Sequence, residues 1–318
     1  MYFLLKYEQI VNKLNSQFLH ILHLVHQIKI CFYYNKVRKA RGIDMTPKKA
    51  LCIHSFATMG RSSTAVIAPA LAAKGIQPVM LPTVVLSTHY GITGPIAKQD
   101  MTSFCKDALE HYRHMGMSFD CVFSGFVSSK EQMDIIKEAY SMTEKGLKLC
   151  DPVMADHGKL YSSITDDLVE GFKELCRHAD LITPNPTEAL ILLGREYDQL
   201  VFTKEEATEI VTALGEMYAN VIITGTKFTD GSVACTGYDK EKKEVFFIPL
   251  NYLPVSYPGT GDLFGGCLAA FVLEGNNLKT ACEKTARFIE KVVAYTYESG
   301  DETKFGVHIE PMLKYLVD

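Results

Sequence analysis

The stretch that decides the fold is Pro258-Gly259-Thr260-Gly261-Asp262. It runs directly into an apolar, small-residue segment at 263–273, Leu-Phe-Gly-Gly-Cys-Leu-Ala-Ala-Phe-Val-Leu, which predicts a buried helix. Gly259, Thr260 and Gly261 therefore form the entrance to that helix. There the first backbone N–H groups lack internal partners and attract anions. Glycines at this position let a bulky anion approach the backbone closely.

Asp262 is the carboxylate of this stretch, and two interpretations of it are open. Beside an anion site, it could take a proton from a hydroxyl that attacks phosphorus. Alternatively, it only caps the helix, as aspartate often does. The stretch by itself favours the cap. The polar clusters found elsewhere in the chain favour the base.

The composition excludes several classes of protein. With 318 residues and 47% hydrophobic residues, the chain can bury one large core or two modest ones. Its net charge of −4 gives no sign of nucleic acid or a membrane surface as a partner. Nine cysteines without a CxxC pair suit free thiols in a reducing cytoplasm, where we expect the protein to act. No apolar run reaches the roughly 18 residues of a spanning helix.

Residues 1–44 do not resemble the rest of the chain. Their apolar clusters are interrupted by histidines and lysines and end in a basic patch at 36–41. No small-residue cleavage site is present, so a secretory signal is not expected. A targeting or docking helix is one interpretation. We favour the other, in which Met45 is the true start, residues 1–44 are an extension outside the core, and residues 45–318 form one domain.

From Lys49 onward, predicted strands and helices alternate. Short apolar runs predict strands at 50–54, 78–81, 119–123, 147–150, 180–182 and 220–223. Helices are predicted at 62–74, 100–115, 129–141, 278–298 and 308–316, and a hairpin at 232–236 and 244–248. This alternation predicts an α/β fold with a mostly parallel sheet covered by helices on both faces.

Polar clusters follow five of the predicted strands. They occupy 55–61, 87–91, 151–161, 183–188 and 224–226. Ligands of open α/β sheets bind at the carboxyl ends of the strands, so these clusters should lie around one site. A GxxxxGK[ST] loop and a strand-borne GxGxxG are both absent from the sequence. If a nucleotide binds, Gly259 to Gly261 must hold its phosphates.

Taken together, these motifs resemble the ribokinase-like superfamily and, within it, the vitamin B6 kinases. The resemblance covers about Lys49 to the C-terminus and implies a three-layer fold with a central, mostly parallel sheet. The glycine stretch looks like the superfamily's anion hole, with Asp262 as its catalytic base. Asn185-Pro186-Thr187-Glu188 matches the NxxE motif, which implies support of magnesium and phosphate. The run from Asp151 to Tyr161 is similar to the DPVMGDxGxxY run of B6 kinases, with Ala155 in place of the usual glycine.

The same resemblance assigns further roles. Asp151 would lie near the nucleotide phosphates or the metal. Ser55 and the loop Thr88-His89-Tyr90-Gly91 resemble segments that hold the pyridine ring, and Tyr90 could stack on that ring or simply pack. A lone loop histidine such as His89 is more often solvated or hydrogen-bonded than functional. Thr224-Gly225 looks like the nucleotide-contacting turn.

The resemblance implies transfer of the ATP γ-phosphoryl group to the hydroxymethyl oxygen of pyridoxal, pyridoxine or pyridoxamine. Magnesium would bind through water and phosphate oxygens near Asp151 and Glu188. The family also implies a homodimer. Whether a monovalent cation assists, and which vitamer is preferred, stay open.

Two alternatives remain open. Hydroxymethylpyrimidine kinases of thiamine biosynthesis share the fold and the DPVM run, but typically carry cysteine at the position of Asp262. A catalytically silent vitamer-binding protein is the other alternative. The intact glycine stretch argues against it, because a pure binder needs no base beside an anion hole.

We predict that a chain beginning at Met45 folds and turns over normally, because residues 1–44 carry none of these motifs. Expression yield, thermal melting and turnover of that shorter chain test this. Loss of solubility or activity would show that the extension supports the domain.

Overall fold

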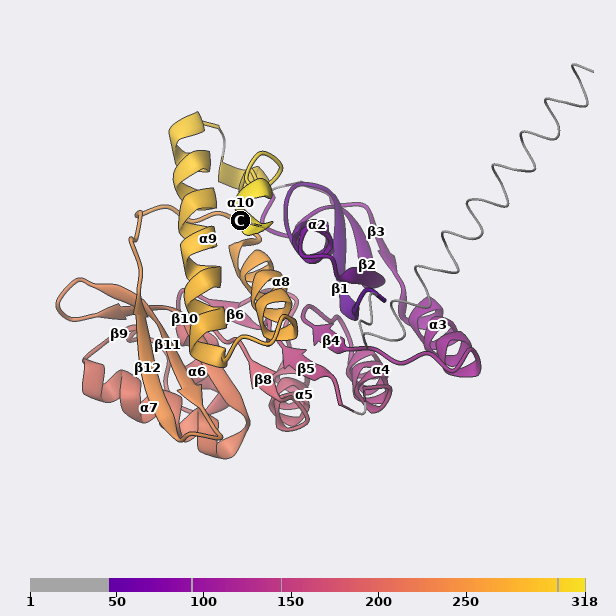
Figure 1. The fold of residues 1–318 in the computed structure, drawn as a ribbon, viewed down its shortest axis with the longest axis horizontal. Helices are drawn as coiled ribbons and strands as arrows, with labels where there is room; N and C mark the ends of the chain where they lie inside the picture. Colours follow the sequence, from indigo (N-terminus) through magenta and orange to yellow (C-terminus); the bar gives the residue numbers. More distant parts are fainter. Residues whose placement is uncertain (1–45, 93, 144, 302, 318) are drawn as a thin grey trace, which may run out of the picture. The chain divides into compact units, whose positions relative to one another are not determined.

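The computed structural model describes residues 46–92, 94–143, 145–301 and 303–317. The predicted extension at 1–44 lies outside these residues, and its boundary stays a proposal. The chain divides into two units, Met1–Pro47 and Lys48–Asp318. The second unit carries the sheet and every motif identified in the sequence (Figure 1).

The centre of this unit is a ten-stranded sheet in the order β12-β11-β10-β8-β5-β4-β1-β2-β3, with β9 pairing to β10. The strands are β1 (Lys49–Met59), β2 (Gln77–Thr88), β3 (Lys98–Asp100), β4 (Cys121–Ser124), β5 (Leu147–Cys150), β8 (Leu181–Ile182), β9 (Val201–Phe202), β10 (Asn220–Phe228), β11 (Val233–Asp239) and β12 (Glu244–Pro249). The pairs from β2 to β10 are parallel, whereas β3, β11 and β12 pair in antiparallel fashion at the two ends. The predicted, mostly parallel sheet is confirmed.

Helices cover both faces of the sheet, as predicted (Figure 1). On one face pack α3 (Thr102–His114), α4 (Lys130–Ser141), α5 (Asp166–Arg177), α6 (Pro186–Leu192) and α7 (Lys204–Met217). On the other pack α2 (Thr64–Ala73), α8 (Thr260–Leu273), α9 (Leu278–Ser299) and α10 (Lys314–Val317). A short 3-10 turn, η1 (Thr303–Phe305), follows α9.

The alternation of side chains along β1 explains why both faces need a cover. Leu51 and Ile53 belong to the core on one face, and Ala50 and Cys52 to the core on the other. All four are fully buried. Successive side chains of a strand point to opposite faces, so a strand that is apolar at every position must lie between two layers.

Several boundaries differ from the sequence prediction. β1 continues to Met59 and pairs with β2 past a register shift between His54 and Phe56, so Ser55 lies inside the strand rather than after it. β10 continues to Phe228, and Thr224-Gly225 form an irregularity within it. The second closing helix is confined to 314–317. The second halves of β1 and β10 consist largely of polar and small residues. They therefore lack the apolar run from which the first half of each strand was predicted.

The sequence prediction gave no bounds for the helices α5, α6 and α7, and very short elements are missing from it as well. They include β3, β9 and the small hairpin β6 (Ala155–Asp156) and β7 (Lys159–Leu160). Two or three residues carry no measurable periodicity. Among the described residues, no helix combines the length and apolar character needed to cross a bilayer.

Glycines let α8 lie close to its neighbours. A Cβ added at Gly265 would overlap the ring of Phe123 on β4, and one at Gly266 would lie 3.2 Å from Cα of Ile67 on α2. Phe123 is fully buried, so its ring has no room to move away. The close packing fixes the first half of α8 relative to β4 and α2.

We predict that Gly265→Ala lowers the melting temperature. Overpacking of this kind costs about 1–3 kcal/mol, which outweighs a helix-propensity gain of about 1 kcal/mol. Adding Phe123→Leu should recover part of the loss, because it makes room for the new methyl group. Thermal melts of the single and double variants test this, and an unchanged or higher melting temperature for Gly265→Ala would contradict it.

Candidate active site

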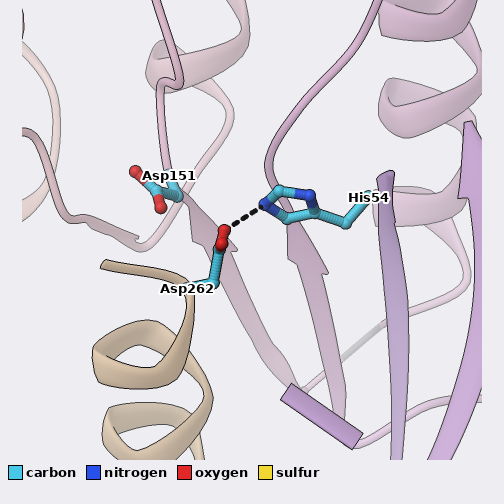
Figure 2. A group of neighbouring side chains, drawn as sticks. All are labelled: His54, Asp151 and Asp262. Carbon is cyan, nitrogen blue, oxygen red and sulfur yellow. Dashed lines mark ion pairs between the residues drawn. The ribbon is translucent and has the colours of Figure 1, made fainter. Parts of the chain in front are cut away.

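The carboxyl ends of β1, β4 and β5 meet the start of α8 at the point where the order of strands reverses. β1 pairs with β2 on one side and with β4 on the other, and later strands extend the sheet beyond β4. A reversal of this kind opens a crevice in which ligands of α/β proteins bind. The sequence-predicted residues Asp151 and Asp262 both lie here (Figure 2).

Asp262 occupies the first turn of α8 and is held by two donors. Its Oδ1 lies 3.0 Å from Nε2 of His54, and its Oδ2 accepts a 2.6 Å hydrogen bond from the backbone N–H of Ser63. Burial raises the pKa of Asp262, but His54, the Ser63 N–H and the more distant His89 outweigh that effect. The net pKa lies below the usual aspartate value, so this carboxylate is ionised at neutral pH.

Asp151 directly follows β5 and faces Asp262 (Figure 2). One ligand atom each of His54, Asp151 and Asp262 lie within 4.8 Å of one another. Burial, reinforced by the negative charge of Asp262 and opposed by His54, raises the pKa of Asp151 to about 7. The two carboxyl groups therefore differ: Asp262 is ionised at neutral pH, whereas Asp151 titrates near neutral pH and a neighbouring cation would favour its ionised form.

The glycine stretch has the predicted shape of a helix entrance. Gly259 is the N-cap of α8, and its φ of 79° lies in the left-handed region that glycine tolerates. A Cβ there would also overlap the carbonyl oxygen of Arg61, so only glycine fits. A Cβ at Gly261 would meet nothing within 4 Å, so the space in front of this turn is open. The hydroxyl of Thr260 donates to the carbonyl of Tyr257.

Asn185 and Glu188 form a capping box at the start of α6. The Asn185 side chain accepts from the Glu188 N–H, and Glu188 Oε2 accepts from the Asn185 N–H. Glu188 Oε1 also accepts from the N–H groups of Met154 and Ala155, and the Asn185 amide donates to the Ala155 carbonyl. The NxxE motif thus ties the loop after β5 to α6 and fixes the approach to Asp151.

Glu188 is fully enclosed by this arrangement. Burial, followed by the nearby charge of Asp151, raises its pKa well above the usual glutamate value, although the three backbone N–H donors act in the opposite direction. Its Oε1 accepts from two backbone N–H groups and its Oε2 from one, so the acceptor capacity that is left lies on Oε2.

The residues expected to hold a pyridine ring divide into two groups. The hydroxyl of Ser55 lies 2.6 Å from that of Ser63, which places Ser55 beside the Asp262 site. His89 instead links its own loop to the segment after α9. Its Nδ1 accepts a hydrogen bond from the Gly91 N–H, and its Nε2 lies 2.6 Å from the Lys304 carbonyl oxygen. Tyr90 is half exposed and packs on Phe126 with ring centroids 5.7 Å apart.

Thr88 is the last residue of β2 and pairs with Met59 of β1. The predicted nucleotide turn, Thr224-Gly225, lies in β10, further along the sheet. The Thr224 N–H donates to the carbonyl of Pro184, and Gly225 has a φ of 67°. The turn therefore lies beside the NxxE segment. Among the described residues, Asp262 makes no hydrogen bond with Tyr90 or Thr224.

Sequence reasoning missed two residues of this site. His54 was assigned only as the end of a strand, yet its side chain is buried at 1% exposure and contacts Asp262. Ser63 contributes a backbone N–H, which no residue pattern reveals. The sequence signal for His54 was its position as the one polar side chain at the end of the run Ala50-Leu51-Cys52-Ile53-His54.

Comparisons with known proteins identify relatives of this chain. The family model described as phosphomethylpyrimidine kinase matches residues 97–307. Pyridoxal kinase of Bos taurus is 30% identical over 223 residues, which cover 61% of this chain and 67% of the bovine enzyme.

Solved structures share the fold. A Bacteroides thetaiotaomicron protein, named as a phosphomethylpyrimidine kinase and crystallised with pyridoxal, has a TM-score of 0.81 and 29% identity, covering 85% of this chain and 96% of that one. Pyridoxal kinase of Lactobacillus plantarum has a TM-score of 0.79 and 26% identity, covering 86% of this chain and 97% of that one. The chain belongs to the phosphomethylpyrimidine kinase family and, with the pyridoxal kinases, to the ribokinase-like superfamily.

Proposed function

We propose that this protein transfers the γ-phosphoryl group of ATP to the hydroxymethyl oxygen of pyridoxal, pyridoxine or pyridoxamine. The observation that carries the proposal is the carboxyl group of Asp262, held by His54 and the Ser63 N–H in the first turn of a glycine-led helix. The similarity to pyridoxal kinases and to a protein crystallised with pyridoxal supports the choice of substrate.

Asp262 acts on the attacking hydroxyl in this proposal. It accepts a hydrogen bond from the hydroxymethyl group, orients its oxygen toward phosphorus and takes the proton as the new P–O bond forms. Phosphoryl transfer passes through a loose transition state, in which the attacking oxygen carries little charge until late. A carboxylate with a lowered pKa suits that chemistry, because correct aim and ionisation count for more than high basicity.

The start of α8 acts on the phosphoryl group. The first N–H groups of a helix have no intrahelical partners, and Gly259 to Gly261 bring them against open space. Charge that spreads over the phosphoryl oxygens during transfer is stabilised by donors already in place. Thr224 and Gly225, at the same sheet edge, are proposed to contact the nucleotide.

The residues present fit a Mg²⁺ ion near Asp151. A buried carboxylate with a pKa of about 7 gains from a neighbouring cation. Within the described part of the chain, the buried hydroxyl of Thr183 next to β5 has no hydrogen-bond partner. We propose that Asp151 holds the ion directly or through water and that Glu188 acts only through water. When bound, Mg²⁺ neutralises charge on the triphosphate.

A second candidate is phosphorylation of hydroxymethylpyrimidine or its phosphate, and the description of the matching family model, phosphomethylpyrimidine kinase, favours it. Turnover assays with ATP and each substrate separate the two. A homodimer and a cytoplasmic location are also proposed, the first on the similarity to B6 kinases. The second rests on the free thiols of the described cysteines, all of them buried.

We predict that Asp262→Asn folds, binds ATP and slows phosphorylation by roughly 10²–10⁴-fold, the usual contribution of a positioned general base. The amide offers one acceptor where the carboxylate offers two, so one contact to His54 or Ser63 is lost. A stability cost of about 1–3 kcal/mol follows. If Asp262 served only as a helix cap, the substitution would leave the phosphorylation rate unchanged.

Single-turnover phosphorylation of pyridoxal and of hydroxymethylpyrimidine, together with a thermal melt, tests this. The parent should phosphorylate the vitamer much faster than the pyrimidine. A folded Asn variant as fast as the parent would refute the assigned mechanism.

We predict that Asp151→Asn alters the pH dependence of stability when metal is chelated. Folded Asp151 keeps its proton to about pH 7, whereas in the unfolded chain it titrates near its ordinary value of 3.8. The folded state therefore binds more protons between about pH 4 and pH 7, and the free energy of unfolding of the parent falls as pH rises through that window.

The Asn variant lacks this loss of stability, so relative to the parent it should gain up to a few kcal/mol at pH 8 and less than half of that at pH 5. Urea unfolding at both pH values with a chelator present measures the difference. A variant no more stable than the parent at pH 8 would contradict the raised pKa.

A further inference from the structure

His54 makes a set of contacts that neither packing nor solvation explains. It lies in β1 beside the register shift, with 1% of its surface exposed. Its Nε2 lies 3.0 Å from Oδ1 of Asp262, and its Nδ1 accepts a 3.0 Å hydrogen bond from the N–H of Ser55. A buried imidazole thus links a strand backbone to the carboxylate at the start of α8.

These contacts identify the protonated nitrogen. The backbone N–H of Ser55 is always a donor, so Nδ1 must present its lone pair, and the proton of a neutral ring then lies on Nε2. That tautomer satisfies both 3.0 Å contacts. The opposite tautomer would satisfy only the longer approach of the Phe126 N–H to Nε2, at 3.4 Å, and would leave two short contacts without a hydrogen bond.

The assignment excludes two other roles for His54. A nitrogen that carries a proton cannot coordinate a metal ion, so the cluster of His54, Asp151 and Asp262 does not bind metal through this ring. Nor can His54 take a proton from Asp262: Nε2 is already protonated, and the Ser55 N–H occupies Nδ1. The role left for the His54 ring is to donate a hydrogen bond from Nε2 to Asp262.

The protein holds the ring tightly in this position. A Cβ added at Gly125, just after β4, would overlap Cδ2 and Nε2 of His54, so glycine is required there. On the other side the ring meets Phe123 edge to face, with centroids 6.3 Å apart. The imidazole therefore packs between Gly125 and Phe123 beside Asp262.

Ser63 holds the second oxygen of Asp262 at a conformational cost. Its φ of 53° is positive, which is unfavourable for a residue other than glycine by about 1–3 kcal/mol. The hydroxyl contact to Ser55 and an isolated bridge to Phe56 keep it in place. In this conformation its N–H points at Oδ2 of Asp262.

We propose that His54 is a positioning residue that, together with the Ser63 N–H, fixes both oxygens of Asp262 so that their remaining lone pairs face the substrate hydroxyl. This inference rests on the proposed kinase function. A carboxylate oxygen has two lone pairs, so each oxygen can accept its fixed donor and still serve the hydroxyl.

His54→Gln and His54→Leu form a matched pair of test variants. The amide nitrogen of glutamine reaches about as far as Nε2 and can donate to Asp262, whereas leucine has similar bulk and no donor. His54→Asn, whose amide is too short to reach, is a second variant without the contact. The measurements are single-turnover phosphorylation of pyridoxal, the KM values for pyridoxal and ATP, and a thermal melt.

We expect leucine and asparagine to slow the chemical step by roughly 10–100-fold, since a small misplacement of a catalytic group has effects of this size. Both KM values should stay within about twofold, and glutamine should restore most of the rate. A leucine or asparagine variant that matches the parent rate would overturn the inference, as would a folded glutamine variant no faster than leucine.

Crystal structures of the variants decide the same point without turnover. We expect the Asp262 carboxylate to adopt one orientation with glutamine and several, or a different one, with leucine or asparagine. An unchanged single orientation in the latter two would overturn the positioning role. A parent chain that phosphorylates no vitamer would instead refute the proposed function, and the crystal comparison would still judge His54.

Discussion

Two neighbouring carboxylates, Asp151 buried and Asp262 partly buried, are the constraint around which this molecule is arranged. Like charges in a water-poor site repel strongly, so Asp151 and Asp262 cannot both be ionised without compensation. The two carboxyl groups have different surroundings, which shift their pKa values in opposite directions. Asp262 receives the His54 ring and the Ser63 N–H, which lower its pKa, while burial raises that of Asp151. At neutral pH Asp262 is therefore ionised before it accepts a proton, and the ionisation of Asp151 depends on a neighbouring cation.

The fold supplies that asymmetry through its topology. The reversal of strand order at β1 and β4 leaves space beside β5, and the glycine-led start of α8 enters that space from another part of the chain. Close backbone contacts make the fit specific: Gly259 lies against the carbonyl of Arg61, and Gly125 lies against the ring of His54. The capping box of Asn185 and Glu188 then ties the loop after Asp151 in place.

Local patterns explain what the sequence could predict. Apolar runs gave the alternating α/β architecture, and the glycine stretch gave Asp262, because both signals lie within a few consecutive residues. His54 was not predicted as a site residue because its role depends on Asp262, which lies far along the chain. At the end of an apolar run it also looks like an ordinary strand residue. The strained backbone of Ser63 and the two-residue strands β6 and β7 leave no trace in residue type.

The distance along the chain between the groups of the site has a consequence for protein synthesis. Ser63 and Asp262 are 199 residues apart, and His54 lies still further from Asp262. A ribosome that has translated β1, β4 and β5 has made His54 and Asp151 but not the carboxylate between them. Domains tend to fold as units during synthesis. A nascent chain therefore has no assembled catalytic centre until α8 has left the exit tunnel, which confines the proposed chemistry to nearly finished molecules.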